Sequence, residues 1–295
     1  MSSEPGIVTR FAPSPTGWLH LGHAYAALFA HEEAKHAGGR FLLRLEDIDT
    51  TRSQPEYEAA IYEDLTWLDL AWEQPVRKQS EHLAEHRAAL EKLRATELLY
   101  PCFCTRREIQ EEIARAGHAP HGPEGPVYPG ICKRLSADEI GSRIADGRDY
   151  ALRLDLEKAM SLAGRDLVWK DLAHGEFTAD PSSLGDVVLA RKDTPTSYHL
   201  AVVVDDAVQG ITLVTRGEDL LFATHLHRLL QALLGLPVPI LKHHRLITDE
   251  NGKRLAKRDD ARSLRTLRAL GWTAQRVRDE LQMPWPWPVE GAVLK

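Results

Sequence analysis

The chain has 295 residues, of which 43% are hydrophobic and 27% are charged. This is the composition of an ordinary globular protein, and it excludes a disordered chain, a collagen-like fibre and a coiled-coil rod. No apolar run approaches the roughly 20 residues of a membrane span. The N-terminal segment MSSEPGIVTR lacks the basic and apolar regions of a secretion signal. We therefore expect a soluble cytoplasmic protein.

The net charge of −6 is unevenly distributed along the chain. Residues 242–278 contain 11 Lys and Arg against 4 Asp and Glu, a local charge of +7, which leaves −13 for the remainder. A local basic patch lets an acidic protein bind phosphates. Two solvated helix faces would give the same pattern, and charge alone favours that interpretation.

The first predicted elements form a βαβ unit. Residues 7–11 and 41–45 are β-prone, and residues 24–36 form a helix that Gly38 and Gly39 end. A strand, a crossover helix and a strand in this order indicate a parallel sheet. Residues 53–72 are predicted as an amphipathic helix with a capping box of Ser53 and Glu56, and residues 80–99 as a second helix.

The rest of the chain alternates between strands and helices. Residues 102–132 are rich in Gly, Pro and His, with one short helix near 107–115, and suggest an inserted subdomain. Strands are expected at 150–154, 187–191, 199–204 and 212–216, and a helix at 220–234. Residues 239–248 are expected to be extended, and a basic loop and two short helices separated at Gly271 follow.

Two motifs suggest phosphate chemistry. His20 and His23, spaced by three, lie where a loop enters a helix, and a helix N-terminus offers free N–H groups to a phosphate. Gly22 between them permits a close approach to the backbone. A cluster of cations at 253–258 follows a Gly and could neutralise a leaving pyrophosphate. Taken singly, each motif is more often a set of surface side chains.

The three cysteines lie close together in the sequence, at Cys102, Cys104 and Cys132. Three thiolates suit a tetrahedral Zn²⁺ ion in a structural site. Spacing alone points to His118 or His121 as the fourth ligand. Three reduced, buried thiols are the alternative.

In their order along the chain, the motifs are far more specific. The segments RFAPSPTGWLHLGH, LLRLEDIDTTR, YHLAVVVDD, VTRGEDLL and GKRLAKR occur in succession between residues 7 and 258. This arrangement resembles the glutamyl branch of the class I aminoacyl-tRNA synthetases. His20-Leu-Gly-His23 matches the HIGH motif with Leu in place of Ile. Arg254–Arg258 matches the KMSKS motif, with Lys257 at the second lysine and Ala256 in place of a serine.

The resemblance implies activation of L-glutamate by ATP, through attack of a carboxylate on the α-phosphorus without a protein nucleophile. It implies His20, His23 and Lys257 as catalytic residues, with Gly22 joining them in ATP binding. The implied glutamate-binding residues are Arg10, Ala12, Ser14, Glu46, Tyr198 and Arg216. It also points to Tyr128 as the fourth zinc ligand, so the implied metal site is Cys102, Cys104, Tyr128 and Cys132. ATP would enter with Mg²⁺ as substrate, and one structural Zn²⁺ is expected per chain.

The 38 residues that follow Lys257 have room for about two short helices, so we expect no large anticodon-binding domain. In this the chain resembles the shortened paralogues of the branch, the glutamyl-queuosine tRNA(Asp) synthetases, which activate glutamate without tRNA and transfer it to the queuosine base at the wobble position. The expected partner is the anticodon stem-loop of queuosine-modified tRNA(Asp), bound by a monomer. A catalytic fragment of an ordinary glutamyl-tRNA synthetase and a non-catalytic binding paralogue are the alternatives.

The expected fold class is α/β, a Rossmann-type parallel-sheet catalytic domain. Residues 1–100 and 186–240 would form its two halves. Residues 101–185 would form an inserted zinc-bearing subdomain, and residues 241–295 the KMSKS-type loop with a short helical C-terminal segment.

Overall fold

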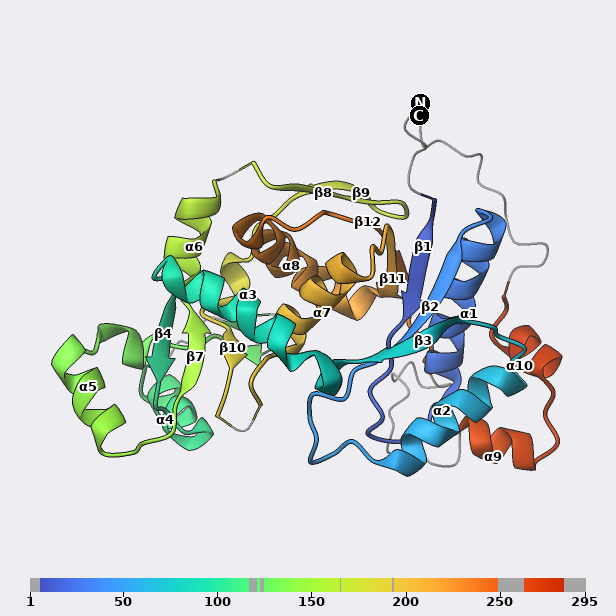
Figure 1. Ribbon diagram of the computed structural model, residues 1–295, viewed down its shortest axis with the longest axis horizontal. Coiled ribbons are helices and arrows are strands. Elements are labelled where there is room, and N and C mark those ends of the chain that lie inside the picture. The colour runs from blue at the N-terminus through green and yellow to red at the C-terminus, as the bar shows by residue number, and fades with distance from the viewer. Residues whose placement is uncertain are drawn as a thin grey trace.

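The structure is a computed structural model that describes residues 6–116, 121–122, 125–164, 166–192, 194–248 and 263–283. The molecule is elongated (Figure 1). A parallel sheet lies towards one end with helices α1 (Leu21–His36) and α2 (Pro55–Trp67). A smaller antiparallel sheet lies at the other end. Helices α3 (Leu83–Ala95), α7 (Tyr198–Val208) and α8 (Leu221–Leu234) lie between them.

The parallel sheet has the strand order of a Rossmann-type fold. Strands β1 (Val8–Phe11), β2 (Arg40–Leu45) and β3 (Glu73–Lys78) pair in parallel, and α1 connects the first two. Beside β1 runs β11 (Leu213–Gly217), where the amide of Thr212 donates to the carbonyl of Val8 at 3.1 Å. β11 then pairs in parallel with β12 (Ile240–His244). The predicted βαβ unit and parallel sheet are confirmed.

A hairpin from the middle of the chain extends this sheet. Strand β8 (Val168–Asp171) pairs in parallel with β12, and β9 (Gly175–Thr178) returns antiparallel to β8. The hairpin falls in the range 101–185 of the expected insert, but it belongs to the sheet of β11 and β12. Sequence reasoning did not predict it.

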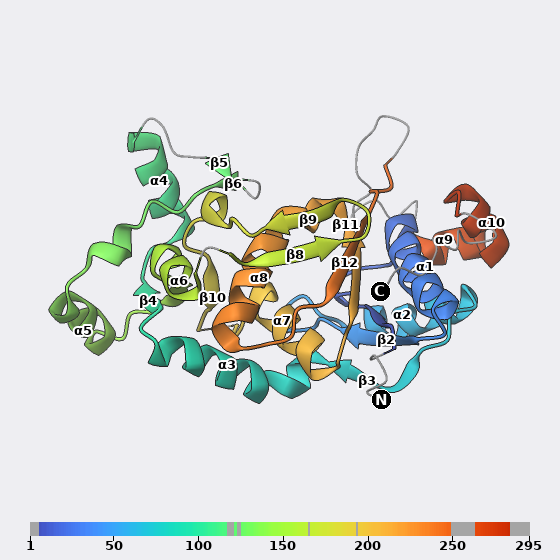
Figure 2. The same cartoon turned by 90° about the horizontal axis from the view of Figure 1, so that it is seen from above.

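The smaller sheet has the order β10 (Val188–Ala190), β7 (Ala151–Leu154), β4 (Leu99–Cys102). Around it lie α4 (Arg106–Ala116), α5 (Ala137–Ala145) and α6 (Leu156–Ala163), as Figure 2 shows from above. Strands β5 (His121–Gly122) and β6 (Gly125–Pro126) form a short ladder beyond α4. Short 3₁₀ turns span Gln79–His82, Ile131–Arg134, Ser182–Leu184 and Glu218–Leu220.

The strand predicted at 199–204 is wrong, because these residues lie in helix α7. The side chain of Ser197 caps this helix by accepting a hydrogen bond from the amide of Leu200. Residues 200–206 are all buried, so the run of Val202 to Val204 has no polar face that could reveal its period. A short, fully buried apolar run does not distinguish a helix from a strand.

Two other helix boundaries also differ from prediction. Helix α2 ends at Trp67, and its N-cap Gln54 makes no side-chain capping bond, so the capping box of Ser53 and Glu56 is wrong. Pro55 begins the helix instead, where its missing N–H costs nothing. The helix predicted at 80–99 begins as a 3₁₀ turn, continues as α3 and ends at Ala95, and Leu99 already belongs to β4.

The two short C-terminal helices are confirmed as α9 (Leu264–Ala269) and α10 (Ala274–Glu280), separated at Gly271. Leu264 and Val277 share one hydrophobic core with α1 and α2. The amide of Leu264 also donates to the carbonyl of Leu19 at 2.7 Å. The residues that directly follow the segment 249–262 are therefore held against the start of α1. Within the described ranges, every helix is too short or too polar to cross a membrane.

Candidate active site

A cavity of about 480 Å³ opens where the parallel strands end. Arg10 lies near the end of β1, Glu46 directly follows β2, and Arg216 lies near the end of β11. Ligands of open α/β sheets bind in the crevice at these carboxyl ends. The structure brings nine predicted site residues to this one cavity: Arg10, Ala12, Ser14, His20, Gly22, His23, Glu46, Tyr198 and Arg216. Lys257 lies outside the described residues.

His20 and His23 form a compact pair at the start of α1. His20 is the N-cap, and its Nδ1 accepts a hydrogen bond from the amide of Gly22 at 3.1 Å. The Nδ1 of His23 accepts one from the amide of His20 at 3.2 Å, and the ring centroids are 3.9 Å apart. A Cβ at position 22 would lie 3.0 Å from the His20 ring, so glycine makes room for this ring.

These two hydrogen bonds fix which nitrogen carries the proton in each neutral ring. A neutral imidazole has one acceptor and one donor nitrogen, and in both rings Nδ1 is the acceptor. The donor is therefore Nε2–H on His20 and on His23. Two such donors beside a helix N-terminus can stabilise negative charge that develops on a phosphate.

Arg10 and Arg44 share one buried carboxylate, that of Asp206 on α7. Arg10 donates to its two oxygens at 2.9 and 3.3 Å, and Arg44 donates at 2.7 Å. Arg10 also donates to the carbonyl of Thr215 at 3.0 Å. Burial alone would raise the pKa of Asp206, but the charges of Arg10 and Arg44 outweigh it and lower that pKa. Asp206 therefore stays ionised and holds both guanidinium groups in place.

Glu46 lines the cavity beside these arginines. Its carboxylate accepts a hydrogen bond from Arg44 at 3.2 Å, and 13% of its side chain is exposed. Burial raises the pKa of Glu46, while Arg44 and Arg10 oppose that rise. A partly accessible carboxylate in this position can bind the ammonium group of an amino acid.

Arg216 has a different environment, because its described partners are neutral. It donates to His243 at 3.2 Å, to His227 at 2.9 Å and to the hydroxyl of Thr224. Among the described residues it makes no ion pair with a carboxylate, and burial lowers its pKa. A buried cation with only neutral partners can bind an anion. Sequence reasoning missed Arg44, Asp206, His227 and His243. For Asp206, the sequence did offer a usable signal, because two adjacent aspartates at 205–206 end an apolar run.

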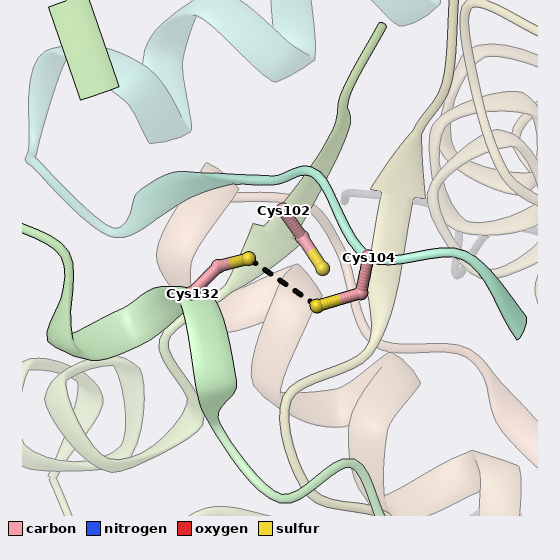
Figure 3. A group of neighbouring side chains, drawn as sticks. All are labelled: Cys102, Cys104 and Cys132. Carbon is pink, nitrogen blue, oxygen red and sulfur yellow. Dashed lines mark hydrogen bonds between the residues drawn. The ribbon is translucent and has the colours of Figure 1, made fainter. Parts of the chain in front are cut away.

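The three cysteine thiols converge beside the smaller sheet (Figure 3). Their sulfur atoms all lie within 4.8 Å of one another, and those of Cys104 and Cys132 are 3.4 Å apart. Cys102 comes from β4, Cys104 from the loop after it, and Cys132 from a 3₁₀ turn. Such a cluster could bind a metal ion.

The hydroxyl of Tyr128 completes the cluster. It lies 3.3 Å from the sulfur of Cys102 and 3.6 Å from that of Cys104. Burial would raise the pKa of the Cys102 thiol, but hydrogen bonds from Tyr128 and Arg153 lower it, whereas burial raises that of Cys104 to about 12. Of the alternative fourth ligands, His118 and the side chain of His121 lie outside the described residues. Three sulfurs and one phenol oxygen together offer four donor atoms, the number that a tetrahedral ion takes.

Comparison with known proteins agrees with this geometry. Residues 6–281 match the family of class I tRNA synthetases (E and Q), catalytic domain. The chain is 50% identical to the glutamyl-Q tRNA(Asp) synthetase of Rhodobacter capsulatus, over 92% of this chain and 98% of that relative. It is 38% identical to the glutamate–tRNA ligase of Aquifex aeolicus, over 97% of this chain and 59% of that relative.

A solved structure has the same fold. The glutamate tRNA ligase from Elizabethkingia meningosepticum, in complex with its amino acid, superposes with a TM-score of 0.70 at 31% identity. The superposition covers 86% of this chain and 52% of the ligase, so the chain spans about half of that protein. The chain therefore belongs to the class I tRNA synthetases of the E and Q group.

Proposed function

We propose that this protein uses ATP to convert L-glutamate to glutamyl-adenylate, without tRNA, and then transfers the glutamate to the queuosine base at the wobble position of tRNA(Asp). The observation that carries the first step is the charge pattern of the cavity. Among the described residues that line it, three arginines (Arg10, Arg216 and Arg245) stand against two carboxylates (Glu46 and Asp219), which leaves a formal excess of one positive charge when the histidines are neutral. Glutamate, with two carboxylates and one ammonium, brings the compensating negative charge.

The roles of the individual residues follow from this pattern. Arg10 and Arg216 bind the two carboxylates of glutamate, and Glu46 binds its ammonium. Tyr198, Ala12 and Ser14 line the same cavity and complete the amino-acid pocket. The reaction is an in-line attack of a substrate carboxylate on the α-phosphorus, so the protein contributes position and charge rather than a nucleophile.

His20, Gly22, His23 and Lys257 bind ATP, which enters with Mg²⁺ as part of the substrate. The described ends of the segment that contains Lys257 support its role. Ile247, before that segment, lines the cavity, and Ser263, after it, forms a β-bridge with His20. The described residues on both sides of the segment thus lie at the cavity or against His20, and a cation from the segment would stabilise the departing pyrophosphate.

The second step is supported by the R. capsulatus relative, which aligns over nearly its whole length and carries glutamyl-Q tRNA(Asp) synthetase as its name. The basic segment 242–278 would contact the anticodon stem-loop. Part of its charge is used internally, because Lys242 pairs with Glu33 and Arg278 with Glu32. Arg265 stacks over Trp18 at 4.6 Å and makes no ion pair within 4 Å among the described residues, so it is one candidate for a phosphate contact.

Cys102, Cys104, Tyr128 and Cys132 would hold one Zn²⁺ with no open position, which makes the ion structural rather than catalytic. The bound ion would tie β4 to the turn that carries Cys132. The tRNA substrate places the reaction in the cytoplasm. A monomer remains our prediction, and light scattering tests it.

The decisive experiment locates the transferred glutamate. Labelled glutamate and ATP are supplied with queuosine-modified tRNA(Asp), unmodified tRNA(Asp) or tRNA(Glu), and nuclease mapping finds the label. We expect label only on the modified base of the first tRNA, because the unmodified base lacks the nucleophilic hydroxyl. Label on the 3′-terminal adenosine of tRNA(Glu) would instead assign the chain to the ordinary glutamate–tRNA ligases. Absence of glutamate-dependent pyrophosphate exchange would make it a binding paralogue.

A further inference from the structure

Arg216 lies in the middle of a row of hydrogen-bonded side chains that crosses the sheet. The row begins at Asp171, the last residue of β8, whose Oδ2 lies 2.6 Å from Nδ1 of His243 on β12. Nε2 of that ring lies 3.2 Å from Nε of Arg216 on the neighbouring strand β11. All three side chains are buried.

The chemistry of the two ends fixes the proton on the ring between them. A carboxylate only accepts hydrogen bonds and a guanidinium only donates them. His243 must therefore donate from Nδ1 to Asp171 and accept at Nε2 from Arg216, which requires the neutral ring with its proton on Nδ1. Burial lowers the pKa of His243 and so favours the neutral ring, although Asp171 opposes the shift. A proton on Nε2 would turn an N–H of the ring towards the N–H of Arg216.

The row continues on the other side of Arg216. Nη1 of Arg216 lies 2.9 Å from Nδ1 of His227, and Nε2 of His227 lies 3.1 Å from Nδ1 of His199. By the same reasoning, His227 is neutral and donates from Nε2 to His199. Burial and the charge of Arg216 lower the pKa of both rings, that of His199 to about 4. Arg216 thus contacts two neutral imidazoles. The carboxylate of the row, Asp171, is separated from it by the ring of His243.

We propose that Asp171 is a positioning residue for Arg216, and that it acts through the tautomer of His243. A direct ion pair, of the kind that Asp206 makes with Arg10, would compensate the charge of Arg216 within the protein. The imidazole spacer instead orients the guanidinium and leaves its charge for a carboxylate of the amino-acid substrate. This inference rests on the proposed activation of glutamate.

Asp171 also has a local structural role that any test must separate from this one. Its Oδ1 accepts hydrogen bonds from the amides of Ala173 and His174, at 2.8 and 3.0 Å, in the turn between β8 and β9. A double-mutant cycle separates the two roles, because only residues that act together are non-additive. The variants are Asp171→Asn, His243→Gln and the double variant. Asp180→Asn is the matched control, since this exposed carboxylate caps a loop at the amide of Ser182 and contacts no member of the row.

The measured quantity is the KM for glutamate in ATP–pyrophosphate exchange. In Asp171→Asn, the new amide can donate to Nδ1 of His243 and stabilise the wrong tautomer. We expect KM to rise roughly 10-fold or more, by analogy with the groups that orient a metal-binding imidazole. The KM for ATP should change less than about 2-fold. In the His243→Gln background, Asp171→Asn should change the KM for glutamate by less than about 3-fold, because a glutamine amide has no tautomer to fix. Asp180→Asn should match the wild type.

If Asp171→Asn raises the KM for glutamate equally in the wild type and in the His243→Gln variant, the inference is overturned. Asp171 would then act only in the turn between β8 and β9. If Asp171→Asn does not fold, as judged by circular dichroism, the pair His243→Leu and His243→Gln replaces it. Leucine removes the acceptor and should raise KM more than glutamine does, and equal values would overturn the inference. Calorimetric titration of the wild type with glutamate distinguishes a failure of this inference from a failure of the proposed function. A wild type that neither binds glutamate nor exchanges pyrophosphate would overturn the proposed function, and this inference with it.

Discussion

The substitution Asp206→Asn tests whether one buried carboxylate holds the amino-acid end of the cavity together. Asp206 Oδ1 accepts from both Arg10 and Arg44, and Oδ2 accepts a second bond from Arg10. Asparagine retains an oxygen for the first two bonds, but its NH₂ group then faces the N–H of Arg10. The substitution also removes the only negative charge that Arg10 contacts within ion-pair distance among the described residues.

The expected loss of stability follows from this geometry. Breaking a buried ion pair by removing one partner costs about 3–5 kcal/mol, because it leaves an uncompensated buried charge. We expect the lower end of that range, about 3 kcal/mol, for Asp206→Asn, and about 5 kcal/mol for Asp206→Ala, which loses all three hydrogen bonds. The free energy of unfolding is obtained from urea titrations followed by tryptophan fluorescence. Asp146→Asn, at an exposed helix end, is the control and should change it by less than about 0.5 kcal/mol.

The contribution of Asp206 should also depend on pH with a defined sign. Its pKa is lowered in the folded protein, so its stabilising effect is fully present above the unfolded value of about 3.9. It is lost as the pH falls through the lower, folded value. The difference between wild type and Asp206→Asn should therefore be constant near neutral pH and shrink only in strong acid. A loss below about 1 kcal/mol at pH 7, together with unchanged pyrophosphate exchange, would refute the assignment of Asp206 as the anchor of Arg10 and Arg44.

Three further predictions concern the phosphate end, the metal and the amino acid. His23→Ala or Lys257→Ala should slow adenylate formation roughly 10²-fold or more while changing glutamate binding little, since each removes a preorganised donor; wild-type exchange rates would contradict these roles. Cys104→Ser should lower the zinc content below about one ion per chain in elemental analysis, and Tyr128→Phe should weaken its retention; freshly purified wild type without zinc would reject the site. Glutamine should support pyrophosphate exchange poorly, because its amide leaves Arg216 without an anion; exchange equal to that with glutamate would refute the pocket.

The sequence by itself determined the features that depend on neighbouring residues. The βαβ unit, the helix that ends at Gly235 and the two C-terminal helices are all visible as local patterns, and the structure confirms them. The order of motifs along the chain also indicated the family and identified nine residues that line the cavity. His20 and His23 are close because a spacing of three on one helical turn requires it.

Only the tertiary structure decided the features that depend on distant segments. The run of Val202 to Val204 is helical although valine favours strands, because it packs in one hydrophobic core with residues of α3 and α8, and tertiary packing overrides local propensity. Arg10 and Asp206 are 196 residues apart in sequence, and Asp171 and His243 are 72 apart. No local periodicity carries such pairings, because they arise when the fold brings together strands and helices that are far apart in the sequence. The sequence thus named the groups that would meet the substrate, and the fold supplied the buried carboxylates and imidazoles that hold them in place.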